Sequence, residues 1–277
     1  MNGQATSADR AVALVGGGRM AQALAAGFHA AGLVDAAAST VVDPAPEARA
    51  RFADRVPGVR FAATGAEAAA AARLVVLAVK PQQAAAACAE IAAALRPDAT
   101  LVSSVAGLTT ARLAALARTP RIVRVMPNTP SLVGRGVAVV CAAPEVDAAD
   151  RRRVLELLAA VGHVHEVDES LMDAVTGLSG SGPGFLALVV EALAAGGERA
   201  GLPAELALAL AVETFAGTGE LLERTRESPA AIRGQVTSPG GTTLAGLAVL
   251  EARGLPQALA DAVVAATARA RELGRSS

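Results

Sequence analysis

The chain of 277 residues is 53% hydrophobic, and its 25 Lys and Arg against 26 Asp and Glu leave a formal charge of −1. This length predicts about two domains with a substantial core, and the balanced charge offers no basic surface for a nucleic-acid backbone. Aromatic residues make up only 2%, and Tyr and Trp are absent. The composition therefore argues against base-stacking surfaces and excludes any mechanism that needs a tyrosine acid, including the Tyr/Lys pair of short-chain dehydrogenases.

The remaining compositional features favour a cytoplasmic protein without metal. The first ten residues are polar and contain no hydrophobic signal region. The long uncharged stretch 174–190 is broken by several glycines and a proline, so we do not expect it to span a membrane. Cys88 and Cys141 are too few and too far apart for a four-ligand zinc site or a disulfide framework.

Short apolar runs alternate with Ala-rich stretches in the first part of the chain. Buried strands are predicted at 11–15, 39–42, 74–79, 100–103 and 121–126, and helices at 20–31, 46–54, 82–95 and 109–117. A further strand pair, 137–141 and 163–167, brackets a helix at 148–160. This alternation predicts an α/β fold for residues 1–167, a Rossmann-type doubly wound, mostly parallel sheet with helices on both faces.

Beyond residue 167 the strand signal disappears, and helical periodicity predicts an all-α domain for residues 168–277. One helix in this region has two apolar stripes. The stripes are Leu208, Ala211, Val212, Phe215 and Ala216 on one side, and Leu202, Leu206 and Leu210 on the other. Two stripes predict burial on more than one side, which favours a symmetric dimer through this domain. The alternative is one compact core that surrounds the helix.

A glycine-rich turn links the first predicted strand to the first helix, in the order Gly16-Gly17-Gly18-Arg19-Met20-Ala21. In a dinucleotide-binding unit Gly16 permits the tight turn, Gly18 lets the backbone approach the pyrophosphate, and Ala21 allows close packing of helix and strand. The free N–H groups at the helix start then stabilise the phosphates. The alternative, a purely structural turn, is weakened by the strand–helix units that follow.

Asp43 follows the second predicted strand. A carboxylate there usually accepts hydrogen bonds from the adenosine ribose, which favours NAD over a 2′-phosphorylated cofactor. Arg19, Arg49 and Arg51 could offset the repulsion of a 2′-phosphate if they lie near. Asp43 is equally a turn residue in Asp-Pro-Ala-Pro, so the preference between NADH and NADPH stays open.

A second glycine-rich segment, Pro239-Gly240-Gly241-Thr242-Thr243, precedes a helix that begins near Leu244. Two glycines at a helix start can form an anion-binding nest, suited to the carboxylate of a substrate. Ser238, Thr242 and Thr243 add hydroxyl groups. The alternative is an ordinary helix capped by Ser or Thr.

Together with the first glycine-rich turn and Ala78-Val-Lys-Pro81, three segments give the chain a resemblance to a known family. They are Arg124-Val-Met-Pro-Asn-Thr-Pro130, Leu178-Ser-Gly-Ser-Gly-Pro183 and Thr237-Ser-Pro-Gly-Gly-Thr-Thr243. From about residue 12 to 273 the chain resembles the pyrroline-5-carboxylate reductases, whose last motif is highly specific. The resemblance implies a cytoplasmic oxidoreductase that transfers a hydride from NADPH or NADH to the cyclic imine 1-pyrroline-5-carboxylate, giving L-proline in the last step of proline biosynthesis. It also implies a homodimer, in some members a ring of dimers.

The resemblance assigns roles to particular residues. Cofactor contacts are implied for Val15, Gly16, Gly17, Gly18, Arg19, Met20, Ala78, Val79 and Lys80, for Asn128 near the nicotinamide, and for Gln235, where some members have an Asn. Substrate contacts are implied for Ser238, Gly240, Gly241, Thr242 and Thr243, with Thr243 bonded to the ring nitrogen. Glu169 would approach the bound product from the dimer partner. Asp43 replaces the residues that many members use near the adenosine phosphate, which leaves NADPH preference open.

The scarcity of acid and base residues agrees with imine reduction. His163 and His165 alternate on one predicted strand and are expected on its solvated face, and His29 is expected to be structural. A protonated C=N bond accepts hydride without forming an alkoxide, so positioning provides most of the rate. A β-hydroxyacid dehydrogenase, the alternative enzyme, requires a lysine in its helical domain, and the only lysine is Lys80. A non-catalytic dinucleotide-sensing dimer would have no use for the nest at Gly240–Thr243.

Overall fold

The computed structural model describes residues 10–276, which form two compact units. One unit comprises the chain up to Ser181 together with the residues from Ala265 onward, and the other is Gly182–Val264. The sequence predicted a boundary after residue 167. The segment 168–181 is counted with the first unit, where Met172 is fully buried against Met126 and Val139. The end of the last helix also belongs there, because the backbone of Gly107 closely approaches Gly274.

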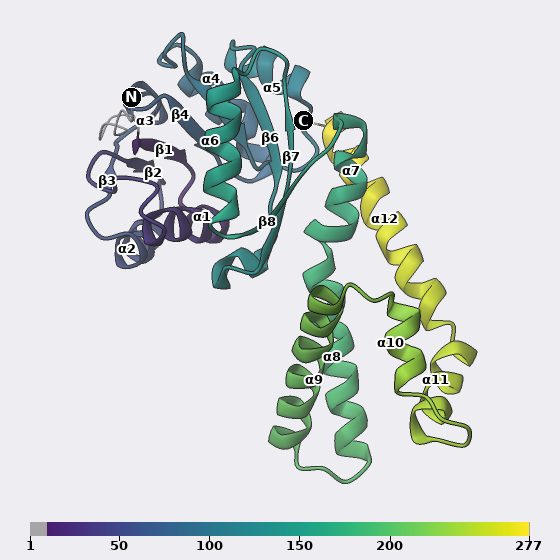
Figure 1. The fold of residues 1–277 in the computed structure, drawn as a ribbon. Helices are drawn as coiled ribbons and strands as arrows, with labels where there is room; N and C mark the ends of the chain where they lie inside the picture. Colours follow the sequence, from purple (N-terminus) through teal and green to yellow (C-terminus); the bar gives the residue numbers. More distant parts are fainter. Residues whose placement is uncertain (1–9, 277) are drawn as a thin grey trace. The chain divides into compact units, whose positions relative to one another are not determined.

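The first unit is built on an eight-stranded sheet in the order β3-β2-β1-β4-β5-β6-β7-β8 (Figure 1). Only the β6–β7 pair is antiparallel; the other pairs are parallel. This arrangement confirms the predicted Rossmann-type sheet. The strands are β1 (Val12–Val15), β2 (Thr40–Val42), β3 (Arg60–Phe61), β4 (Leu74–Leu77), β5 (Thr100–Ser103), β6 (Ile122–Met126), β7 (Gly136–Ala142) and β8 (Gly162–Glu166). The two-residue β3 was not predicted, because it is exposed and lacks an apolar run.

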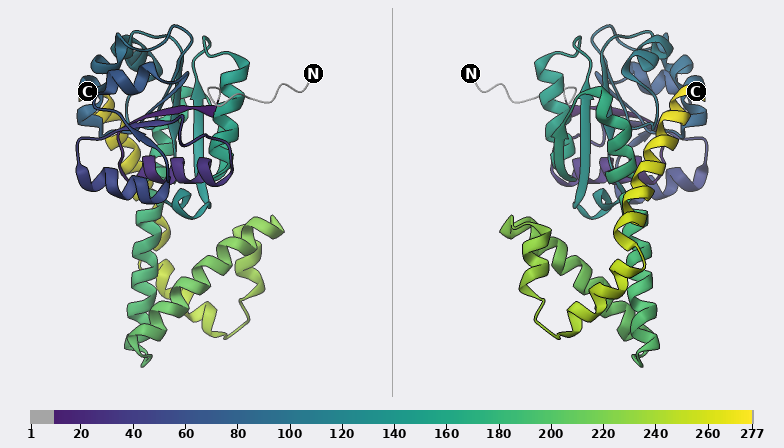
Figure 2. Two further views of the ribbon diagram at one scale, coloured as in Figure 1. Left: turned by 90° about the vertical axis from the view of Figure 1, so that its left-hand side faces the viewer. Right: turned by 90° about the vertical axis from the view of Figure 1, so that its right-hand side faces the viewer.

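Helices cover both faces of the sheet (Figures 1 and 2). They are α1 (Arg19–Ala30), α2 (Pro46–Arg55), α3 (Gly65–Ala70), α4 (Ala84–Ala92), α5 (Thr110–Ala117) and α6 (Ala148–Ala159). Successive residues of a strand point to opposite faces. Leu14 accordingly joins a buried cluster with α1 and α6, whereas Val15 joins a second cluster with α3, α4 and α5. Burial on both faces explains why β1 is continuously apolar.

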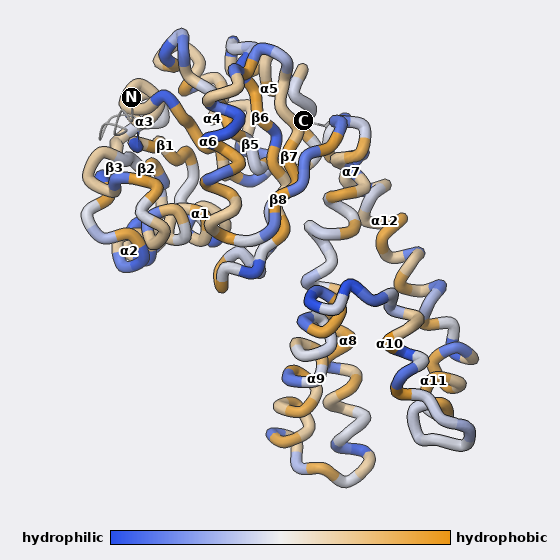
Figure 3. The backbone as a smooth tube through the Cα atoms, in the orientation of Figure 1, coloured by the Kyte–Doolittle hydropathy of each residue, from blue (hydrophilic) through white to orange (hydrophobic). Residues whose placement is uncertain are grey.

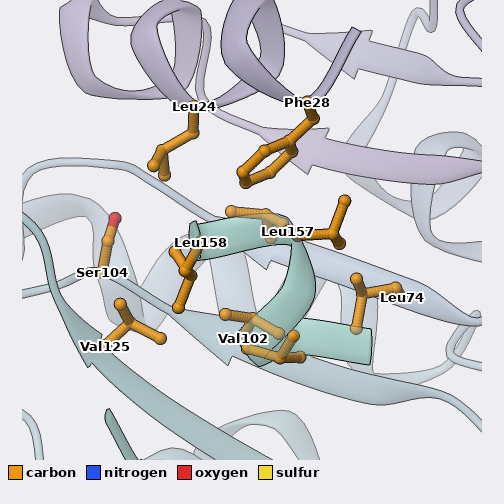
Figure 4. Close-up of a pocket in the computed structure, with 10 residues that line it drawn as sticks. Leu24, Phe28, Leu74, Val102, Ser104, Val125, Leu157 and Leu158 are labelled. Carbon is orange, nitrogen blue, oxygen red and sulfur yellow. The ribbon is translucent and has the colours of Figure 1, made fainter. Parts of the chain in front are cut away.

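A small apolar cavity of about 10 Å³ remains between α1, α6 and the sheet. Figure 4 shows Leu24, Phe28 and Leu157 around it. Its volume is about that of one water-sized sphere, and Ser104 is the only polar residue in its lining. The cavity is therefore a gap in core packing and too small for a substrate.

A continuous helical stretch begins after β8. It contains the 3-10 turn η4 (Glu169–Leu171), α7 (Met172–Val175), the π-helical turn η5 (Thr176–Gly180) and α8 (Gly182–Arg199). By length and composition alone, Glu169–Arg199 could cross a membrane, which is weak evidence for a membrane protein. The sequence predicted that glycines and Pro183 interrupt this region. Instead α8 begins directly after the turn at Ser181, and Pro183 is accommodated because it lies in the first turn of α8, where a missing N–H is tolerated.

The second unit is entirely helical, as predicted, and exposes much apolar surface. It contains the whole of α8, then α9 (Ala204–Thr225), α10 (Pro229–Gln235) and α11 (Thr242–Ala252), and the start of α12 (Leu255–Ser276). Figure 3 shows apolar residues recurring along α8 and α9. Both predicted stripes are largely exposed, with Leu206 46% and Leu208 50% exposed. Ala211 of the first stripe is buried, and Leu202 of the second precedes α9. The alternative of one compact core around α9 is therefore wrong for the single chain.

Candidate cofactor and substrate sites

The first glycine-rich turn lies between the ends of β2 and β4, the two neighbours of β1 in the sheet. The N–H of Gly16 donates to the carbonyl of Val42 at 2.9 Å, and the N–H of Ala78 donates to the carbonyl of Val15 at 2.8 Å. Gly16 has φ +99°, and a Cβ there would lie 2.6 Å from the carbonyl oxygen of Ala78. Only glycine permits this approach, which brings the predicted Ala78–Lys80 segment beside the turn.

Helix α1 begins at this turn with its first N–H groups uncovered. Gly18 is its N-cap residue and is extended, no side chain caps the helix, and its first turn contains no acidic residue. A Cβ at Gly18 would meet nothing within 4 Å. The open backbone and the positive end of the helix dipole make this helix start a suitable site for a phosphate group.

The carboxylate of Asp43 faces the glycine-rich turn. Its Oδ2 accepts a hydrogen bond from the N–H of Gly17 at 2.7 Å, and its Oδ1 accepts one from the N–H of Ala45 at 2.9 Å. The second bond is the Asx turn that the Asp-Pro-Ala-Pro sequence favours. Arg19, Arg49 and Arg51 were the candidates to offset a 2′-phosphate. Of these, Arg49 donates to the backbone carbonyl of Asp43 at 3.2 Å, just after β2.

Gln22 was not among the predicted site residues, yet it contacts the same turn. It lies on α1, is only 3% exposed, and donates from Nε2 to the carbonyl of Gly17 at 2.7 Å. The available signal was a polar residue on the buried side of an apolar helix, between Ala21 and Ala23. Such a residue needs a hydrogen-bond partner, and the turn supplies it.

Asn128, predicted near the nicotinamide, joins two backbone segments of the first unit. Its Nδ2 donates to the carbonyl of Ser179 in η5 at 3.1 Å, and its Oδ1 accepts from the N–H of Val137 at 2.8 Å. The side chain is nearly buried. Because a π-helical turn displaces carbonyl groups from the regular helical pattern, Asn128 helps to satisfy the backbone at this turn.

Glu169, predicted to reach a bound product, is hydrogen-bonded within its own chain. Its carboxylate accepts from the backbone N–H and from the hydroxyl of Thr110, each at 2.6 Å, and from Arg124 at 3.4 Å. Arg124 also donates to Asp173 at 3.2 Å and is 2% exposed. Sequence reasoning did not predict this cluster, because its members are far apart in the chain and Arg124 lies inside an apolar strand.

The second glycine-rich segment belongs to the second unit and forms a tight turn. The N–H of Gly241 donates to the carbonyl of Ser238 at 2.9 Å. Pro239 occupies the second position of this turn, and Gly240, with φ +74°, the third. This is the residue pattern of a type II turn, whose third position requires positive φ.

Helix α11 follows this turn with Gly241 as its N-cap. No side chain caps it, and its first turn contains no acidic residue. The alternative of an ordinary helix capped by Ser or Thr is therefore wrong here. Ser238 is exposed and Thr243 is half-buried. The start of α11 thus presents backbone N–H groups and hydroxyls, a combination suited to a carboxylate.

The remaining predicted residues are distributed as follows. Gln235 is the last residue of α10 and donates to the carboxylate of Glu227. His163 and His165 are both exposed on β8, as expected, and His29 is half-buried on α1. The glycine-rich turn, Asp43 and Ala78–Lys80 therefore gather in the first unit, and Ser238–Thr243 in the second.

A dinucleotide-binding sheet whose glycine-rich turn is open to a phosphate, followed by a helical unit, is typical of nicotinamide-dependent oxidoreductases. A family model described as pyrroline-5-carboxylate reductase dimerisation matches residues 169–273, and one described as NADP oxidoreductase coenzyme F420-dependent matches residues 11–107.

Full-length relatives identify the family. The chain is 43% identical to the pyrroline-5-carboxylate reductase of Synechocystis sp., over 95% of this chain and 97% of that protein. It is 39% identical to that of Pseudomonas aeruginosa, over 95% and 96%. The crystal structure of Plasmodium falciparum pyrroline carboxylate reductase with NADP bound matches with a TM-score of 0.88 and 29% identity, over 96% of this chain and 99% of that one. The chain belongs to the pyrroline-5-carboxylate reductase family.

Proposed function

We propose that this chain reduces 1-pyrroline-5-carboxylate to L-proline with NADPH or NADH, the last step of proline biosynthesis. The observation that supports this most strongly is similarity over nearly the whole length of curated pyrroline-5-carboxylate reductases. The similarity spans both the glycine-rich turn of the first unit and the Ser238–Thr243 turn of the second. A β-hydroxyacid dehydrogenase or a non-catalytic sensor would not account for it.

The glycine-rich turn fits a dinucleotide. The contact of Gly16 with Ala78 leaves no space for a side chain, whereas the space in front of Gly18 is open. Residues Val15–Met20 would hold the pyrophosphate, and Ala78, Val79 and Lys80 would follow the ribose. Asn128 and Gln235 are further proposed contacts. When bound, the reduced nicotinamide supplies the hydride.

The substrate site is proposed at the start of α11. The N–H groups of Thr242 and Thr243, with the turn Ser238–Gly241, would bind the carboxylate of the imine. The Thr243 hydroxyl oxygen would accept a hydrogen bond from the protonated ring nitrogen, which orients the C=N carbon. A neutral hydroxyl beside a cationic imine avoids the repulsion that a lysine would cause. Hydride addition then yields the amine without an alkoxide, so positioning contributes most of the rate.

We propose that residues 1–167 are the dinucleotide-binding domain and that residues 168–277 are the substrate-binding and dimerisation domain. The chain would form a homodimer through the exposed apolar stripes of α9. Leucines such as Leu206, Leu208 and Leu210 are exposed in the single chain, and an exposed apolar surface of this kind is typical of a protein–protein interface. Glu169 would approach the product from the partner subunit. We further propose that the dimers assemble into a ring and that the protein is cytoplasmic. It would bind neither nucleic acid nor a membrane.

The decisive experiment is a steady-state assay with 1-pyrroline-5-carboxylate and either NADPH or NADH, followed at the nicotinamide absorbance. We expect oxidation of the cofactor together with formation of L-proline, which chromatography would quantify. The ratio of kcat/KM for the two cofactors gives the preference. A folded protein that oxidises neither cofactor in the presence of the imine would refute the reductase assignment.

A further inference from the structure

Three consecutive glycines form the turn that would bind the cofactor pyrophosphate, and two side chains hold the peptide groups of the middle one. The N–H of Gly17 donates to Asp43 at 2.7 Å, and its carbonyl accepts from Gln22 at 2.7 Å. We propose that Asp43 and Gln22 are positioning residues that fix Gly17, and that Asp43 thereby supports cofactor binding independently of the ribose 2′ position. This inference rests on the cofactor role given to the turn above.

The two hydrogen bonds that join Asp43 and Gln22 to the peptide groups of Gly17 are called the clamp below, and this clamp favours glycine as the middle residue of the turn. The dinucleotide-binding pattern G-x-G leaves this position free. Here a Cβ on Gly17 would lie 3.1 Å from the Cβ of Asp43 and 3.3 Å from its Oδ2. A side chain at residue 17 would therefore press on Asp43, which would have to shift by a few tenths of an ångström. Gly17 and Asp43 form a matched pair.

Both partners are themselves held in place. Gln22 is 3% exposed and lies on the buried side of α1, so its amide has little rotational freedom. Asp43 is fixed by the second hydrogen bond, from the N–H of Ala45 to its Oδ1. The clamp thus connects the turn with α1 on one side and with the residues that follow β2 on the other.

The clamp offsets the conformational entropy that three consecutive glycines lose when the turn becomes ordered. Glycine loses more conformational freedom on ordering than any other residue, and Gly16-Gly17-Gly18 places three of them at the site. Without fixed neighbours, ordering of the turn would accompany cofactor binding and weaken it. Hydrogen bonds that order the turn beforehand raise affinity for any ligand that uses its N–H groups. This effect is the same for NADH and NADPH, because they share the pyrophosphate.

The alternative role of Asp43 is a direct bond to the ribose 2′-hydroxyl. The two roles predict different results with 2′-deoxy-NADH, which lacks that hydroxyl. Dissociation constants are measured by titration calorimetry for the parent and for Gln22→Met, Asp43→Ala and Asp43→Asn. Asp54→Asn is the matched control, since it removes one carboxylate from an exposed position on α2.

We expect Gln22→Met to raise the dissociation constants of NADH and NADPH by the same factor, about threefold to tenfold for one lost hydrogen bond. Asp43→Ala should raise the dissociation constants of NADH and of 2′-deoxy-NADH equally, by a factor similar to that of Gln22→Met. Asp43→Asn keeps one acceptor oxygen, so its dissociation constants should lie between those of Asp43→Ala and the parent. Asp54→Asn should bind as the parent does. Thermal midpoints of the free proteins verify that each variant is folded.

Three outcomes would overturn the proposal. One is an Asp43→Ala effect that disappears with 2′-deoxy-NADH, since that result assigns Asp43 to the ribose. Another is a folded Gln22→Met variant with parental dissociation constants. The third is an Asp43→Asn variant that binds no better than Asp43→Ala. Because binding is measured without the imine, a chain that binds cofactor but does not reduce the imine would contradict the proposed reaction and leave this inference intact.

Discussion

Arg124 on β6 donates to the carboxylate of Glu169, which begins the helical stretch leading to α8. The same guanidinium donates to Asp173, and Glu169 in turn accepts two hydrogen bonds from Thr110 at the start of α5. Arg124 is 2% exposed, and its Nε has no hydrogen-bond partner among the described residues. The buried charge therefore depends on two carboxylates that are themselves partly exposed.

The two carboxylates should act together on stability. Glu169→Gln or Asp173→Asn alone leaves Arg124 one acidic partner, and we expect each to lower the free energy of unfolding by about 1.5–3 kcal/mol. The double variant leaves a buried guanidinium with no carboxylate and should lose more than the sum of the single losses. Urea unfolding of the four proteins measures the coupling. Additive losses would show that the two ion pairs are independent.

Thr243 tests the proposed substrate orientation. Thr243→Ser keeps the hydroxyl and should retain most of kcat/KM for the imine. Thr243→Val keeps the shape but removes the hydrogen bond to a charged group, and should lower kcat/KM about tenfold to a hundredfold. The KM for the reduced cofactor should change little in either variant. Equal kcat/KM in Thr243→Val and the parent would remove the hydroxyl from the mechanism.

The exposed stripe on α9 tests the proposed dimer. Fully burying one leucine contributes about 1.5–3 kcal/mol, and a twofold interface uses each residue twice. Leu206→Glu combined with Leu210→Glu should therefore raise the dissociation constant of the dimer at least about a hundredfold. Sedimentation velocity over a range of concentrations measures this change. Val133→Glu, at a position that is 77% exposed in the first unit, serves as the control. A double variant that remains dimeric would place the interface elsewhere.

Asp147 should make stability depend on pH in acid. Its carboxylate accepts a hydrogen bond from the N–H of Asp150 at 2.8 Å and lies 2.8 Å from Arg121. The bond from the backbone of Asp150 and then the bond from Arg121 lower the pKa of Asp147 to about 2. In the unfolded chain this pKa is about 3.9. The ionised carboxylate therefore stabilises the fold above about pH 4, and this contribution disappears as the pH falls from 4 towards 2.

Asp147→Asn should accordingly be less stable than the parent at neutral pH and should lose less stability between pH 4 and 2. Urea midpoints measured across this range make the comparison, with Asp54→Asn as a control that should follow the parent. Parallel curves for the parent and Asp147→Asn would contradict the assignment of this pH dependence to Asp147.

Local sequence was sufficient for the elements with a strong periodic signal. Val12–Val15 and Thr100–Ser103 are short and continuously buried because both faces of the sheet are covered, and the predicted strands agree with β1 and β5. The edge strand β3 gave no such signal, since both its residues are exposed. The π-helical turn η5 could not be predicted either, and one of its carbonyls accepts a hydrogen bond from Asn128, which is distant in the sequence.

The sequence by itself determined the class of fold, the glycine-rich turns and the residues that match the family, because these depend on periodicity and on conformations that only glycine adopts. Tertiary structure decided what each polar side chain contacts. Gln22 and Asp43 meet at Gly17, and Arg124 meets Glu169, only because strands and helices far apart in the chain pack together. Hydrogen-bond partners are set by distances in space, and those distances exist only once the sheet has formed.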